Sequence, residues 1–322
     1  MGGKGGIMGR ERNATMKKTI LPLTLLALTA LACNMTVSFA PTSQPEPEPT
    51  PVLPTLTVPP APTQAVPTQP QPTSEAPDLP EPTVPPQPLS GSTITFHQLT
   101  VTLPQTVANG ASGSEIPRND STEAAQWQKT PGHLQVSLDG YYALQGKTNQ
   151  PVIYVFSALD YAQLVPAAFE SIHRLRNYLY DPNNVPALDQ MPGVPFMNAK
   201  ILFAAQILPL SFQNGTGVRY ITEYAQGPVQ ANNTDLFYNY IGVTDDGNDY
   251  VVVILPITSP VLAESGDLSA PIPSGGVPYP DNGRADPYFI AISDLLNVQP
   301  GGSFSPSLDM LDSLIQSISI AP

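Results

Sequence analysis

Apolar and polar positions in residues 91–322 follow patterns that predict short strands and a few helices. Residues 93–103 alternate between apolar and polar for much of their length, which is typical of a strand. Residues 104–131 are polar and contain several turn-forming residues, so we expect a long loop there. The continuous apolar run 151–157, PVIYVFS, predicts a strand that is buried on both faces.

Three hairpins are expected, because an Asp-Gly or Asn-Gly pair accommodates the positive φ angles of a tight turn. The first hairpin, residues 134–144, turns at Asp139-Gly140. The second, residues 200–225, turns at Asn214-Gly215, and the third, residues 236–257, turns at Asp246-Gly247. Pro209 has no amide hydrogen to donate, so its strand should lie at a sheet edge or be bulged there. In the third hairpin a two-residue turn leaves both faces apolar, so another layer should cover each face.

Helical spacing of apolar residues appears in three places. The longest stretch, 161–179, includes Phe169 among its core positions, and Pro166 either kinks this helix or marks a late start. Residues 285–297 form a second candidate. A last helix is expected after these residues, with Ser305 as its N-cap and Pro306 in its first turn. The apolar stripe of that helix comprises Leu308, Leu311, Leu314, Ile315 and Ile318.

These elements predict an α+β fold, an antiparallel β-sheet with a few packing helices in one domain over residues 91–322. A disordered proline-rich tether is expected to precede it. The chain has 40 prolines, and residues 41–88 alternate Pro with Thr, Gln, Glu, Val and Ala. This segment could bury too little apolar surface to offset the conformational entropy that it would lose on ordering. Polyproline II rises ~3.1 Å per residue, so this segment could reach on the order of 100–150 Å as a spacer. The alternative is a PxxP-type ligand for a partner's groove.

The N-terminal region has the organisation of a bacterial export signal. Met16-Lys17-Lys18 is a short basic start, and residues 19–32 form an uncharged apolar run that is too short to span a bilayer. The run ends in Ala30-Leu31-Ala32-Cys33, which resembles the lipobox of bacterial lipoproteins, although Ala30 stands where Leu is commoner. Residues 1–15 fit no part of a signal peptide and are interpreted as a mis-annotated start.

The resemblance implies cleavage before Cys33, lipidation of its sulfur, and an extracytoplasmic domain that is lipid-anchored to the bacterial cell membrane. Residues 16–32 would then be the signal peptide and residues 33–90 the lipidated cysteine and linker. Cys33 is the only cysteine of the chain, so no internal disulfide can compete for it. The alternative is an ordinary secretory signal with an incidental cysteine.

Charge narrows the range of partners. The whole chain carries −13, and the 25 acidic and 8 basic residues from Cys33 onward give that part a charge near −17. Nucleic acid and anionic headgroups would be repelled, so neither is an expected partner.

The middle of the domain is similar to a group of uncharacterised proline-tethered bacterial lipoproteins. The residues that carry the resemblance are Phe212-Gln213-Asn214-Gly215 with Gly217-Val218-Arg219-Tyr220-Ile221-Thr222 and Tyr224-Ala225-Gln226, Asn232-Asn233 with Leu236-Phe237-Tyr238, and Gly242, Thr244 and Asp246-Gly247. The resemblance implies a shared domain over roughly residues 130–320 and no known activity. More weakly, a sheet followed by a C-terminal helix is similar to the PsbP/Mog1 fold.

Residues suited to catalysis or metal binding are scattered. His97, His133 and His173 are the three histidines, and none stands at metal-ligand spacing from another. Ser112 lies in Gly-Ala-Ser-Gly, which is not a nucleophile elbow. Residues 245–249 gather acidic oxygens but lack the pattern of a calcium loop, so a turn is the simpler interpretation. No metal and no cofactor is therefore expected.

Tyrosines on neighbouring strands form the most suggestive set. Together with Arg219 they could line a groove for a sugar or a peptide. The set comprises Tyr220, Tyr224, Tyr238, Tyr240 and Tyr250. Cross-strand packing of the rings is the alternative. Arg219 and Glu223 are expected to pair on one strand face, and Trp127 is either an exposed binding residue or a plug on the core.

We therefore expect a cell-surface lipoprotein whose domain binds or scaffolds without catalysis. Its partners would be the membrane, through Cys33, and an envelope protein or glycan. The alternatives are an extracytoplasmic hydrolase and a small-ligand receptor. A cleft where a histidine or paired carboxylates meet a nucleophile would favour the hydrolase, whereas an exposed apolar patch without them would favour binding.

Overall fold

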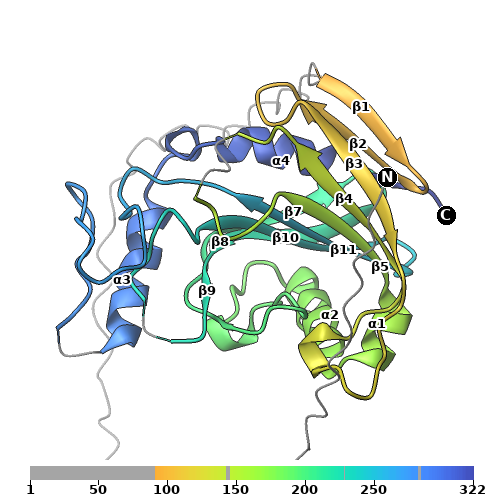
Figure 1. Ribbon diagram of the computed structural model, residues 1–322, viewed down its shortest axis with the longest axis horizontal. Helices are drawn as coiled ribbons and strands as arrows, with labels where there is room; N and C mark the ends of the chain where they lie inside the picture. Colours follow the sequence, from red (N-terminus) through yellow and green to blue (C-terminus); the bar gives the residue numbers. More distant parts are fainter. Residues whose placement is uncertain (1–90, 143–145, 228, 282–283) are drawn as a thin grey trace, which may run out of the picture. The chain divides into compact units, whose positions relative to one another are not determined.

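The computed structural model describes residues 91–142, 146–227, 229–281 and 284–322 (Figure 1). It has antiparallel sheets with helices packed against them, so the α+β prediction is confirmed. The predicted signal peptide, Cys33 and the proline-rich linker lie outside the described residues. Within the described part of the chain, no helix combines the length and the apolar character needed to cross a bilayer.

The main sheet has seven antiparallel strands. In spatial order they are β3 (Gly110–Ile116), β4 (His133–Asp139), β5 (Val152–Ser157), β11 (Asp249–Pro256), β10 (Phe237–Thr244), β8 (Gly215–Thr222) and β7 (Ala205–Phe212).

Two smaller sheets and four α-helices complete the described part of the chain. The small sheets are β1 (Gly91–Phe96), β2 (Leu99–Pro104) and β12 (Ser319–Ile320), and β6 (Lys200–Ile201) with β9 (Tyr224–Ala225). The helices are α1 (Ala158–Leu164), α2 (Pro166–Tyr180), α3 (Ala285–Asn297) and α4 (Leu308–Gln316). Short 3-10 turns occur at Gln126–Gln128, Leu188–Gln190 and Gly301–Ser303.

A hydrophobic core lies on each face of the main sheet (Figure 1). On one face α1 and α2 cover the sheet, and on the other face α3, α4 and β2 do so. Because successive strand residues point to opposite faces, strands between two cores must be apolar at every position. This explains the apolar runs of β5 (residues 152–156) and β11 (residues 250–256) and the mostly apolar sequence of β10, in which the buried Asn239 is polar.

The predicted pairing of the third hairpin is confirmed. Val243 lies opposite Tyr250, as a two-residue turn at Asp246-Gly247 requires. The two faces then separate into the two cores as expected, with Ile241 in one and Tyr240 in the other.

The second hairpin is confirmed as β7 and β8, but its turn is Gln213-Asn214, one residue earlier than expected, because Gly215 already pairs with Phe212. β7 is the edge strand of the main sheet, as Pro209 indicated.

The N-terminal strand predictions need three corrections. Residues 93–103 form two strands, because the chain reverses at His97, whose φ is +51°. The expected loop 104–131 contains β3, an exposed edge strand that needs no apolar residues and so gave no signal. The expected hairpin 134–144 was wrong, since β4 pairs with β3 and β5.

The helix predictions were largely right. The bounds of α3 match, and the stripe from Leu308 to Ile318 is buried. Pro166 starts a separate helix, α2, in the first-turn position where its missing amide hydrogen costs nothing. Ser305 is not the cap of α4. Its backbone pairs with Thr258, and Ser307 occupies the N-cap position.

Candidate functional site

The tyrosines of the expected groove do not share a surface. Tyr220, Tyr238, Tyr240 and Tyr250 are fully buried. Tyr220 lies opposite Asn239 in the ladder, which places it on the other face from Tyr238 and Tyr240. Tyr220 and Tyr250 therefore belong to the core under α1 and α2, and the other two to the opposite core. Of the two interpretations of these tyrosines, the structure supports cross-strand packing of the rings and not a tyrosine-lined groove.

The buried hydroxyls take part in the packing. Tyr240 donates to the carbonyl of Leu210 at 3.0 Å, and Tyr250 shares a 2.8 Å hydrogen bond with Ser171. Tyr220 donates to the carbonyl of Pro192. Burial raises the pKa of Tyr220 and of Tyr240 well above the ordinary value, so both remain neutral donors. The half-buried Tyr224 accepts from the amide of Val194 at 3.1 Å.

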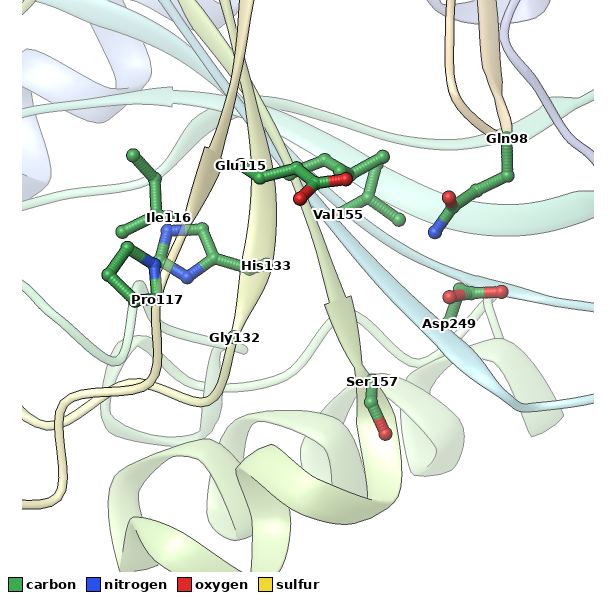
Figure 2. Close-up of a pocket in the computed structure, with 10 residues that line it drawn as sticks. Gln98, Glu115, Ile116, Pro117, Gly132, His133, Val155, Ser157 and Asp249 are labelled. Atoms are coloured by element: carbon green, nitrogen blue, oxygen red, sulfur yellow. The ribbon is translucent and has the colours of Figure 1, made fainter.

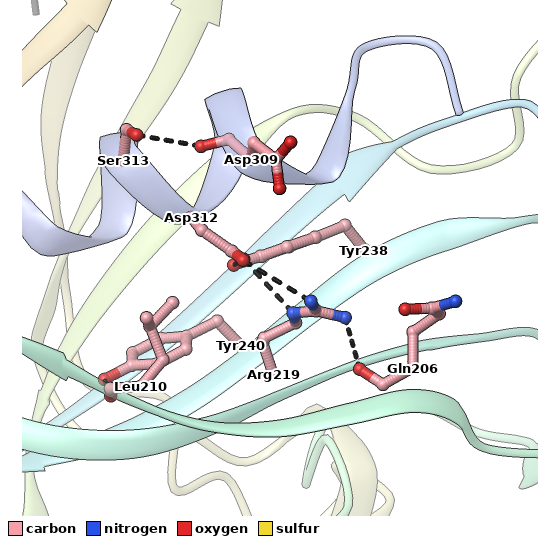
Figure 3. A network of polar contacts seen from close by, with 8 residues as sticks. All are labelled: Gln206, Leu210, Arg219, Tyr238, Tyr240, Asp309, Asp312 and Ser313. Carbon is pink, nitrogen blue, oxygen red and sulfur yellow. Dashed lines mark hydrogen bonds and ion pairs between the residues drawn. The ribbon is translucent and has the colours of Figure 1, made fainter. Parts of the chain in front are cut away.

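Arg219 is the centre of a polar network inside the core that α4 covers (Figure 3). Its guanidinium donates to the two carboxylate oxygens of Asp312 at 3.1 and 3.4 Å, and Tyr238 donates to the same carboxylate at 2.8 Å. Burial raises the pKa of Asp312, although Arg219 and Tyr238 oppose that shift. The expected pair of Arg219 with Glu223 was wrong, because the strand ends at Thr222 and Glu223 turns elsewhere.

Gln206 extends this network to α3. Its carbonyl accepts from Arg219, and its backbone has a positive φ of +54° within a bulge of β7. Its side chain donates to the carbonyls of Leu296 and Gln299 at 2.8 and 2.9 Å, at the C-terminus of α3. The bulge thus fixes the end of α3 against the edge strand.

A second buried cluster surrounds Glu223, which is 1% exposed. Its carboxylate accepts from the backbone amide of Asn232 at 2.7 Å, and the Asn232 side chain also donates to Asp235 at 3.0 Å. Lys147 donates to the carbonyl of Ile257 at 2.8 Å in the same region. Burial raises the pKa of Glu223 well above its ordinary value, and the nearby Asp235 adds to that rise. The same burial lowers the pKa of Lys147.

A polar pocket of about 490 Å³ lies at the ends of β3, β4 and β5 (Figure 2). Ser157, Asp249 and His133 line it, but Ser157 already accepts from the amide of Asp160 as the N-cap of α1. Nδ1 of His133 lies 2.9 Å from the carbonyl of Pro131, and burial lowers the pKa of this histidine. Figure 2 shows His133 and Ser157 on separate walls, so they do not form a nucleophile–base pair.

The other candidates from the sequence do not line that pocket, although Glu115, the partner of His97, does. His97 contacts Glu115 at 3.0 Å, and His173 is exposed on α2. Asp246 accepts from Thr244 at 2.6 Å within a turn, as the simpler interpretation held. No group of three metal-ligating side chains occurs among the described residues. Trp127 is 39% exposed and lies in a 3-10 turn.

An apolar groove of about 460 Å³, here called the α3 groove, lies between α3, the loop before β6 and the start of β7. Ile290 and Val185 are 64% and 55% exposed at its walls. Asp286 and Asp294 are the charged residues among those that line it. The remaining lining residues are Pro186, Leu188, Met191, Leu202, Phe203, Ala204, Ile207, Phe289, Ser293 and Asn297.

This groove could not be predicted from the sequence, because its walls come from three separated segments. One signal was available. Tyr288, Phe289, Ile292 and Leu296 form the buried stripe of α3, and Ile290 falls off that stripe as a large apolar residue without a core position.

Comparisons of the chain with protein-family models, with curated proteins and with solved structures found no match.

The Arg219 network yields a stability prediction. Asp312→Asn leaves the guanidinium of Arg219 buried without a counter-charge, so we expect a loss of roughly 2–4 kcal/mol in the free energy of unfolding. The exposed Asp309 of the same helix provides the matched control, and Asp309→Asn should cost less than about 1 kcal/mol. Urea unfolding followed by circular dichroism measures both. Equal losses of stability in the two variants would show that the Arg219–Asp312 ion pair does not stabilise the packing of α4.

Glu223 yields a pH prediction. Because its folded pKa is raised, the folded state binds the proton more tightly than the unfolded chain does. The stability from this group is therefore present below the ordinary Glu pKa and is lost as the pH rises through the raised pKa. We expect wild type to lose stability relative to Glu223→Gln as the pH rises from about 4.5 to 8.

Urea midpoints of the two proteins across that range test this expectation, because the other titrating groups cancel in the difference. Glu264→Gln, at an exposed acid of the same cluster, serves as the control and should keep the wild-type profile. A constant difference between wild type and Glu223→Gln would contradict the assignment.

Proposed function

We propose that this protein is a bacterial envelope lipoprotein, anchored through Cys33 and a proline-rich spacer, whose domain binds without catalysis. The proposed ligand is an apolar, positively charged segment of another protein, held in the α3 groove. The observation that carries the proposal is the exposure of Ile290 and Val185 around an apolar hollow.

Exposed apolar side chains around a hollow are a common feature of protein-binding sites. Single exposed apolar residues are ordinary, but a contiguous set that borders a concave site is typical of a binding surface. Ile290, Val185 and Leu188, which is 38% exposed, gather at one such hollow. Burial of these groups by a partner would gain roughly 25 cal/mol for each Å² removed from water.

The charges at the rim indicate the sign of the charge that the ligand should carry. Asp286 and Asp294 lie eight positions apart on α3, which is about 12 Å along a helix at 1.5 Å per residue. An extended peptide rises about 3.3 Å per residue, so basic residues at positions i and i+4 would span a similar length. A peptide probe for this groove should therefore carry leucine-like residues between two cations.

The polar pocket of Figure 2 supports a hydrolase less well. Ser157 caps α1 by accepting a hydrogen bond from the amide of Asp160, and Nδ1 of His133 lies within hydrogen-bond distance of the carbonyl of Pro131. A binding role requires no such pair, so the apolar groove is the better-supported site.

The test uses a fluorescein-labelled heptapeptide with Lys at the second and sixth positions, Leu at positions three to five and Ser at both ends, and a control peptide with Glu in place of both Lys residues. We expect fluorescence anisotropy to detect binding of the Lys peptide to the full chain, and at least about tenfold weaker binding of the Glu peptide.

Ile290→Asp should weaken binding of the Lys peptide by at least about tenfold, because it places a charge on the apolar wall. Leu268→Asp is the matched control, because Leu268 is 54% exposed but does not line the groove, and it should leave binding unchanged. Equal affinities for the two peptides, or equal effects of the two substitutions, would contradict the proposed site.

The anchor has a separate test. Cys33→Ala removes the acceptor sulfur, so we expect the protein to leave the membrane fraction and to lose incorporation of labelled palmitate. Cell fractionation and gel mobility provide the measurement. An unchanged membrane fraction with unchanged mobility would refute the lipoprotein assignment.

A further inference from the structure

A second apolar hollow lies between α1, α2 and the turn that holds Gly247. It encloses about 380 Å³ and is here called the α1–α2 patch. Leu159 and Phe169 are 65% and 54% exposed at its edges. Helical spacing predicted a core position for Phe169, and this prediction was wrong, because its ring lies at the surface. The buried positions of α2 are Ala168, Ser171, Ile172, Leu175 and Tyr178.

The rim of this patch is basic. Arg176 and His173 line it, and no carboxylate is among its described lining residues. The ring of His173 stacks on Phe169 with centroids 6.2 Å apart and an interplanar angle of 17°, so the aromatic surface and the basic groups form one continuous area. Arg and aromatic side chains are both enriched in protein interfaces.

The α1–α2 patch and the α3 groove complement each other. Each combines a hollow with protruding apolar side chains, Phe169 and Leu159 in the patch and Ile290 and Val185 in the groove. The rim of the patch carries Arg176, whereas the rim of the groove carries two carboxylates. Opposite charges at the rims of two apolar surfaces favour their association over the pairing of either surface with itself.

We infer that the protein segment bound by the α3 groove is the α1–α2 patch of a second copy of this chain. This inference rests on the proposed function, because it names the partner of the same groove. The contact joins two different surfaces, so a copy whose groove is occupied still presents its patch, and the copy bound through its patch still presents its groove. Anchoring on one membrane would raise the effective concentration of the copies, so a weak contact would suffice.

Sedimentation velocity of the full chain tests the inference, in a Cys33→Ser background that prevents disulfide-linked dimers. We expect the average mass to rise above that of a monomer as the protein concentration increases. Arg176→Glu and the double variant Asp286→Lys/Asp294→Lys should each weaken self-association by at least about tenfold. Lys129→Glu makes the same charge change outside both surfaces and should associate like wild type.

Mixing provides the sharper test. The Arg176→Glu chain keeps an intact groove, and the double variant keeps an intact patch. An equimolar mixture of the two should therefore form heterodimers, although neither variant associates alone. Circular dichroism spectra that match the wild-type spectrum establish that each variant is folded.

A wild-type chain that remains monomeric at its highest soluble concentration would overturn the inference, as would variants that associate like wild type, or a mixture that does not associate. The heptapeptide separates this failure from that of the proposed function. If Arg176→Glu and wild type bind the Lys peptide but wild type does not self-associate, the groove remains a binding site and only the identity of its partner is wrong. If neither peptide nor second copy binds, both proposals fail.

Discussion

The buried ion pair between Arg219 and Asp312 is the constraint on which much of the structure depends. A guanidinium inside a hydrophobic core requires a counter-charge and acceptors for its donors. Asp312 can supply the counter-charge only if α4 packs over the face of the sheet from which Arg219 projects, and Gln206 can supply its carbonyl only if β7 bulges. The same residue then binds the C-terminus of α3. One charge in the core therefore positions two helices, and with them one wall of the α3 groove.

Covering both faces of the main sheet determines where binding can occur. Other elements pack against both faces of the central strands, so the tyrosines of these strands are buried core residues. Their hydroxyls are neutral and form hydrogen bonds. The described hollows with exposed apolar side chains on which the two proposals rest are formed by α1, α2 and α3 and by the loop before β6. In this fold the sheet supplies rigidity, and the helices that protect it supply the surfaces available to partners.

Much of the fold could be predicted from the sequence, because strongly periodic segments leave few alternatives. The pairing of Val243 with Tyr250 followed from a two-residue turn and from apolar residues on both faces. β3 could not be predicted, since an exposed edge strand needs no apolar pattern. The candidate site was harder, because strand order decides which tyrosines share a face and because three distant segments form the groove. Phe169 illustrates a further limit. Helical spacing predicts an apolar stripe on a helix, but it does not show which residues at the edges of that stripe pack into the core.

Amide hydrogen exchange of the full chain, with and without the Lys heptapeptide, tests most directly whether the α3 groove is a binding site. Bound peptide should slow local opening of the segments that it covers. We expect slower exchange in residues 185–191, 202–207 and 285–297, and unchanged exchange in β3 on the opposite edge of the sheet. Unchanged exchange in all three groove segments under conditions where the peptide binds, or protection around the pocket of β3, β4 and β5 instead, would contradict the account.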